Sequence, residues 1–87
     1  MAKVYLPTQL RELTDGIMPI EVDGNTIRVI IASLDERFPG LGARLAAGDS
    51  LAPGLAVSVD GAMSSRGLFT PVTPNSEVHF HPAIGGG

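Results

Sequence analysis

Residues 25–40, NTIRVIIASLDERFPG, predict the main helix of the chain. Their apolar side chains recur at steps of three and four residues, which places them along one stripe of an amphipathic helix. The stripe consists of Ile27, Ile30, Ile31, Leu34 and Phe38. Asn25 or Thr26 is available as the N-cap, and Pro39 and Gly40 end the run. This stretch therefore supplies one helix with a single face to bury.

Two strands are predicted before this helix. Residues 3–6 (KVYL) form the first and stop at Pro7, and residues 17–22 (IMPIEV) form the second and stop at an Asp–Gly turn. The stretch between them is polar and ends at another Asp–Gly pair. Pro19 has no N–H to donate to a ladder, so we expect the second strand at a sheet edge or irregular at that point.

Shorter elements are predicted after the helix. They are a second helix in residues 41–48, a strand in 55–59, a mostly irregular stretch in 62–76 with a brief strand at 68–69, and a last strand in 77–81. In the last strand, Val78 and Phe80 share one face, while His79 and His81 share the other.

This order predicts an α+β fold, a small mixed sheet crossed by one main helix. It is the pattern of the ubiquitin-like β-grasp fold, although periodicity alone leaves other small α+β folds open. We expect residues 1–81 to form the β-grasp domain and residues 82–87 to be a flexible C-terminal tail that ends in Gly-Gly.

The composition excludes several classes of function. The 87 residues carry a net charge of -3, and the six basic residues are scattered, which argues against nucleic-acid binding. The absence of cysteine removes disulfides, thiolate metal sites and thiol nucleophiles together. No signal peptide is evident, and the longest apolar run is too short to cross a bilayer, so we expect a cytoplasmic protein with no membrane partner.

Catalytic and metal sites are not expected. Glu77, His79 and His81 could line up as three ligands on one strand face, but no other cluster supports them, and we favour an exposed polar face without a metal. There is no glycine-flanked nucleophilic serine and no glycine-rich loop before a helix that would hold a phosphate. The chain is therefore expected not to be an enzyme and to bind no cofactor itself.

The last residues, HPAIGGG (81–87), allow two interpretations. Three glycines at the end of a small domain are either a frayed end or a segment that another protein grips. Residues without Cβ let a narrow channel close around the backbone. A terminal carboxylate becomes a useful electrophile only after activation, for which adenylation is the usual route.

The chain resembles the MoaD/ThiS family of ubiquitin-like sulfur carriers over essentially its whole length. The resemblance rests on EVHFHPAIGGG (77–87), LRELTDG (10–16), LDERFPGLGARL (34–45) and LFTPVTPNSEVHF (68–80). In that family a last strand runs into a proline, a few small or apolar residues and a terminal Gly-Gly. The order of these stretches together with the terminus is more specific than any one of them.

The resemblance implies a carrier function. An adenylating enzyme of the ubiquitin-activating type would consume ATP to form an acyl-adenylate on Gly87, and a sulfurtransferase would convert it to a thiocarboxylate. A client enzyme, such as the large subunit of molybdopterin synthase, would receive the sulfide in molybdenum cofactor biosynthesis. Carriers for cysteine or thiamine share the same tail. By the same resemblance, Gly86 is the essential neighbour of Gly87, and Gly85 is a spacer.

Partner contacts are expected around the tail and on the last strand. The residues expected to bind partners are Pro82, Ala83, Ile84, Gly85, His81, His79 and Phe69. The position before the proline is often apolar in the family, whereas His81 stands here, which suggests a more polar or pH-sensitive contact. Leu55 or Phe69 is the alternative source of apolar area, and core packing is the other interpretation of each.

Two further functions stay open on the residues alone. A protein modifier would use the same adenylated Gly87 to form an isopeptide bond with a lysine. A β-grasp interaction module would bind partners without any covalent chemistry. Neither alternative requires a different fold.

Overall fold

The computed structural model describes residues 1–83, and its main helix is α1, Ile27–Arg37. Thr26 is the N-cap, since its hydroxyl accepts a hydrogen bond from the Val29 N–H at 3.3 Å. Four residues of the predicted stripe, from Ile27 to Leu34, are buried, and Phe38 is half-buried against them. The periodicity thus predicted both the helix and its buried face.

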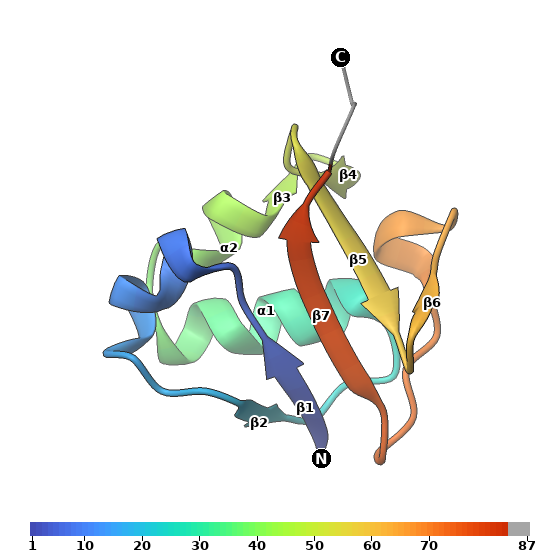
Figure 1. The fold of residues 1–87 in the computed structure, drawn as a ribbon, viewed down its shortest axis with the longest axis horizontal. Coiled ribbons are helices and arrows are strands. Elements are labelled where there is room, and N and C mark those ends of the chain that lie inside the picture. Colours follow the sequence, from blue (N-terminus) through green and yellow to red (C-terminus); the bar gives the residue numbers. More distant parts are fainter. Residues whose placement is uncertain (84–87) are drawn as a thin grey trace.

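Five strands form a mixed sheet that α1 crosses on one side (Figure 1). The strands are β1 Ala2–Tyr5, β2 Ile20–Val22, β5 Leu55–Val59, β6 Ala62–Met63 and β7 Glu77–Pro82. The spatial order is β2-β1-β7-β5-β6. The last strand therefore lies in the centre, parallel to β1 and antiparallel to β5. The α+β, ubiquitin-like β-grasp prediction is confirmed, and β2 with Pro19 before it lies at an edge as expected.

Register sorts the side chains of β7 between two faces. Val57 pairs with Phe80 and Val59 with Val78, and these rows point into the core. His79 pairs with Ser58 on one side and Tyr5 on the other, and this row lies on the face away from α1. The buried apolar residues of the core are Ala2, Val4, Leu6, Leu10, Ile20, Val22, Ile27, Ile30, Ile31, Leu34, Leu41, Leu45, Val57, Leu68, Val72, Val78 and Phe80.

Two connecting segments form 3-10 helices that were not predicted from the sequence. Residues 8–14, predicted only as a polar stretch, form the 3-10 helix η1, Thr8–Thr14, which buries Leu10 and Thr14. The brief strand predicted at 68–69 is wrong, because η2, Gly67–Phe69, is a turn of 3-10 helix. Gly67 starts that turn at φ +55°, a left-handed conformation that glycine adopts at little cost.

The segment from α1 to β5 makes a second, small layer. Helix α2, Leu41–Leu45, confirms the first part of the short helix predicted over residues 41–48. The prediction is wrong for the residues that follow, because Ala46–Ala47 form strand β3 and pair with β4, Ser50–Leu51. The Asp35 carboxylate accepts hydrogen bonds from the N–H groups of Gly40 and Gly42 at 3.1 and 2.9 Å. This contact fixes the start of α2 against the end of α1.

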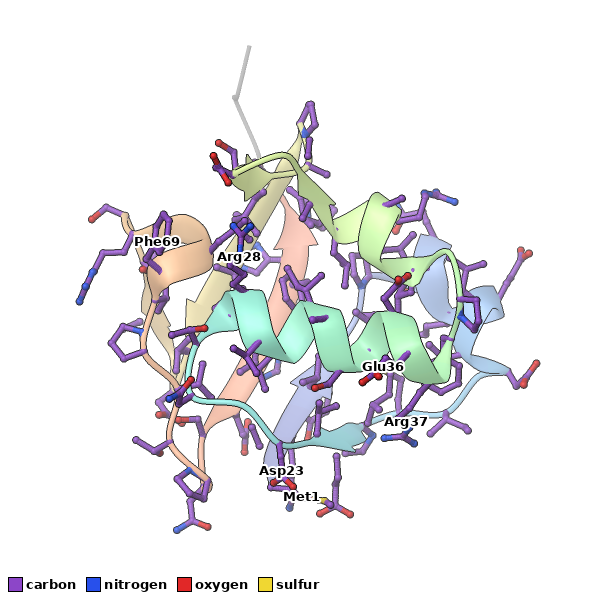
Figure 2. All side chains as sticks on the ribbon, turned by 180° about the vertical axis from the view of Figure 1, so that it is seen from behind. Met1, Asp23, Arg28, Glu36, Arg37 and Phe69 are labelled. Carbon is purple, nitrogen blue, oxygen red and sulfur yellow. The ribbon has the colours of Figure 1, made fainter. Side chains whose placement is uncertain are left out.

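The same C-terminal end of α1 is also tied to the edge strand β2. Seen from behind, Arg37 reaches from α1 toward β2 (Figure 2). Its Nη1 donates to the Glu21 carbonyl at 2.8 Å, and its guanidinium lies 5.4 Å from the centre of the Phe38 ring.

Within residues 1–83, no helix is long and apolar enough to span a bilayer.

Candidate functional site

The candidate site is the place where the central strand leaves the sheet. β7 runs to Pro82, which pairs with Leu55, and the Ala83 N–H donates to the Gly54 carbonyl at 2.9 Å. The strand therefore includes Pro82, the residue at which the flexible tail is predicted to begin. Figure 1 places this end of β7 beside the start of β5 and near the β3–β4 hairpin.

Pro82 fits in the strand because of its position in the ladder. Hydrogen-bonded and non-hydrogen-bonded pairs alternate along an antiparallel pair. The bonds from Asp60 N to Glu77 O and from Ala83 N to Gly54 O mark the bonded rows, so the Leu55–Pro82 row is a non-bonded one. The nitrogen of Pro82 therefore points toward the β1 side, where the pairing with β1 has already ended at Tyr5. No ladder bond is lost.

We predict that Pro82→Ala changes the free energy of unfolding by no more than about 1 kcal/mol, mainly through the greater freedom of the unfolded chain. Phe80→Ala, two residues earlier on the same strand, is the comparison, since Phe80 is buried and its truncation should cost about 3–5 kcal/mol. Urea unfolding of both variants measures the difference. If Pro82→Ala lowers the free energy of unfolding by several kcal/mol, the conclusion that the Pro82 nitrogen points away from β5 is wrong.

The predicted tail residues Ile84, Gly85, Gly86 and Gly87 lie outside the described residues. What the structure gives is the anchor that precedes them. Ala83 is held by Gly54, and four residues of the printed sequence follow it. At about 3.3–3.6 Å per residue, a chain of four residues spans at most about 13–14 Å when fully extended.

His79 lies on the outer face of the sheet in a fixed setting. Its ring stacks on Tyr5 with centroids 4.4 Å apart and planes 5° from parallel, and its Nε2 lies 3.3 Å from the Glu77 Oε1. Side-chain exposure is 42% for His79 and 56% for Glu77. Among residues 1–83, no three His, Cys, Asp or Glu side chains are placed to hold a metal ion together. The row thus presents a polar, partly aromatic surface beside the tail.

His81 lies nearer the tail, in a hollow of about 330 Å³. Ala56, Met63, His81, Pro82 and Ala83 line it, and we call it the outer-face hollow. Of the partner-binding residues expected from the sequence, it brings together His81, Pro82 and Ala83. Met63, at 63% exposure, supplies the apolar surface there. The sequence reasoning missed Met63 because it treated residues 62–76 as mostly irregular.

Phe69 does not join this hollow. It lies on η2 with 57% of its surface exposed, so core packing, the alternative left open for it, is wrong (Figure 2). Leu55, the other residue considered, is half-buried and packs against the core.

A second hollow of about 420 Å³ lies on the other side of Pro82. Its walls come from η1, α2, the loop before β5 and the end of β7, and we call it the end hollow. Its lining residues are Pro7, Gln9, Leu10, Ala43, Arg44, Ala52, Pro53, Gly54, Leu55 and Pro82. Four separate segments meet there, so no local motif in the sequence could have indicated it.

The described part of the site therefore offers positioning rather than catalysis. The sheet carries the chain to a fixed exit point, and Pro82 separates two hollows that a partner could contact.

Comparison with known proteins agrees with this arrangement. The model of the ThiS family matches residues 4–87. The sulfur carrier protein CysO of Mycobacterium tuberculosis is 30% identical over 91 residues, which cover 97% of this chain and 96% of that protein. Its name describes a carrier rather than an enzyme.

Two solved structures extend the comparison to the fold. The crystal structure of the Amycolatopsis orientalis BexX/CysO complex contains a chain that is 31% identical, with a TM-score of 0.88 and full coverage of both chains. The crystal structure of Mycobacterium tuberculosis CysO is 27% identical, with a TM-score of 0.86 over 97% of this chain and 100% of the other.

Proposed function

The chain belongs to the ThiS family, and from that premise we propose that it is a sulfur carrier whose Gly87 is converted to a C-terminal thiocarboxylate. The observation that carries the proposal is the extent of the similarity. The family match runs to residue 87, so it includes the terminal glycines, and relatives that are similar over nearly the whole chain are named sulfur carriers.

The proposed chemistry takes place on the Gly87 carboxylate. The carboxylate attacks the α-phosphorus of ATP in an adenylating enzyme of the ubiquitin-activating type, which gives an acyl-adenylate and pyrophosphate. Sulfide delivered by a sulfurtransferase then displaces AMP from the acyl carbon. After transfer of the sulfur to a client, hydrolysis of the acyl–sulfur bond returns the carboxylate. No side chain of the carrier is consumed, which is compatible with a chain that lacks cysteine.

The anchor at Ala83 supports this role. The reactive terminus has to enter the active sites of several enzymes in turn. When the residue before it is held in place, less conformational entropy is lost as the terminus reaches the reacting position. The Ala83–Gly54 hydrogen bond and the central position of β7 give that fixed start. Gly86 and Gly87 are the residues proposed to enter the active sites.

We infer that cysteine biosynthesis is the first client pathway to test. The relatives reported above bear the name CysO, and none of their names refers to molybdopterin synthase. The large subunit of that enzyme, and thiamine biosynthesis, are the alternative clients. The crystal structure of the BexX/CysO complex supports the idea that carriers of this kind bind a separate protein.

The test is the intact mass of the protein produced together with the sulfur machinery of its own organism. The proposal expects a mass gain that corresponds to one oxygen replaced by sulfur, and its loss when a client and its acceptor substrate are added. Conjugation of Gly87 to lysines of other proteins, without any sulfur gain, would instead identify a protein modifier. An unmodified mass under all these conditions would contradict both covalent functions.

A further inference from the structure

We propose that the end hollow, with Arg44 at its rim, is the docking point for the adenylating enzyme that acts on Gly87. The enzyme is inferred to insert an apolar side chain into the hollow and to place a carboxylate against Arg44. This inference rests on the proposed function, and it adds a specific contact surface outside the tail.

The short reach of the tail carries the first step. The four residues that lead from Ala83 to the carboxyl of Gly87 span at most about 13–14 Å when fully extended, and Ala83 is held to Gly54. An active site that encloses this carboxyl therefore has walls that touch the surface around Pro82 and Gly54. Both residues line the end hollow. We therefore infer that the enzyme contacts this part of the carrier.

The chemistry of the lining identifies what fits. Leu10, Leu55, Pro53 and Ala43 give the hollow apolar walls, and its volume of about 420 Å³ lies in the range of pockets that take small ligands. An aromatic or aliphatic side chain that fills such a pocket at an interface contributes much of the binding energy. An apolar anchor is thus the expected occupant.

Arg44 adds a charge requirement. It is the one charged residue in the lining, it is exposed, and it has no ion-pair partner among residues 1–83. A guanidinium presents a planar fork that binds carboxylates with two hydrogen bonds. A carboxylate next to the apolar anchor therefore matches this rim. Although the whole chain carries a net charge of -3, the charged side chain that lines the end hollow is basic.

A third hollow, of about 230 Å³ between α1 and the β3–β4 hairpin, lacks these features. Its arginine, Arg28, already lies 3.3 Å from Asp49, and no residue of β7 lines it. It therefore provides a control position, Ala32, rather than a rival docking point.

Two substitutions test the proposal in the full-length chain. Arg44→Glu reverses the rim charge, and Ala43→Phe fills the hollow from an exposed position on α2. Arg66→Glu and Ala32→Phe make the same chemical changes at exposed positions that do not line the end hollow. Pyrophosphate release by the adenylating enzyme of the same organism, measured against carrier concentration, gives KM and kcat.

We expect Arg44→Glu and Ala43→Phe each to raise the KM for the carrier by about tenfold or more, with kcat nearly unchanged, because docking is weakened while the tail is intact. The two controls should keep the wild-type KM. Replacing the facing carboxylate of the enzyme by lysine should restore the affinity for Arg44→Glu.

The outcomes separate this inference from the proposed function. If the wild-type carrier is adenylated but both variants keep its KM, the docking proposal is wrong and the carrier function stands. If the adenylating enzyme gives no turnover with the wild-type carrier, the carrier function fails, and the docking proposal fails with it. Circular dichroism of each variant checks that a raised KM does not arise from unfolding.

Discussion

Deletion of Gly87 is expected to abolish the sulfur-dependent mass gain, even though the shortened chain still ends in two glycines, Gly85 and Gly86. The deletion moves the terminal carboxyl back by about 3.3 Å, while Ala83 stays bound to Gly54. A displacement of about 1 Å from the reactive geometry can cost about a hundredfold in rate. Modification should therefore fall below detection by intact-mass measurement.

Gly85→Ala is the matched control for this deletion. It keeps the number of residues after Ala83 and leaves Gly86 and Gly87 in place. Since Gly85 is expected to be only a spacer, this variant should gain sulfur as the wild type does. Full modification of the chain that lacks Gly87 would show that the Gly-Gly end is sufficient and that the distance from Ala83 is not decisive.

Local patterns in the sequence predicted the parts of the fold that local forces determine. The stripe from Ile27 to Leu34 predicted α1 because a long amphipathic helix repeats its period several times. The alternation in residues 77–81 predicted which side chains of β7 point inward, since a strand has a period of two. Both periods are properties of one segment and need no knowledge of its neighbours.

The 3-10 segments could not be predicted in the same way. Leu68 is buried and Phe69 exposed, an alternation that also suits a strand. The hydrogen bonds from Phe69 N to Arg66 O and from Thr70 N to Gly67 O make a tight turn instead. A turn of this length shows no repeated period, so burial alone could not distinguish it from a strand.

The residues of the candidate site also fall into two groups, those that the sequence could identify and those that only the tertiary structure brings together. His81, Pro82 and Ala83 could be assigned to the tail region because they precede the terminal glycines in the chain. Met63 and Arg44 could not be assigned, because they reach the tail only through strand order and the packing of α2. A surface that several distant segments form depends on tertiary structure, and one sequence does not reveal it.

Leu34→Ala is expected to destabilise the fold by about 2–5 kcal/mol. Leu34 is fully buried on the face of α1 that covers the sheet, so truncation leaves a cavity in the core. At about 0.05–0.15 kcal/mol per residue, the whole domain has only about 4–13 kcal/mol of stability. The urea concentration at the midpoint of unfolding should therefore be much lower than in the wild type. The m-value, which is the slope of the free energy of unfolding against urea concentration, should change little.

Val29→Ala tests whether this loss comes from the core or from the helix itself. Val29 lies on the same helix but is 43% exposed, so its truncation removes little buried surface. Alanine also favours the helix over valine by a few tenths of a kcal/mol, so we expect a change within about 0.5 kcal/mol of zero. Similar losses in the two variants would mean that α1 is stabilised mainly by its own backbone. A large loss of unfolding free energy that is confined to Leu34→Ala would mean that the packing of α1 on the sheet stabilises the fold. That packing then also keeps β7, which leads to Ala83, in position.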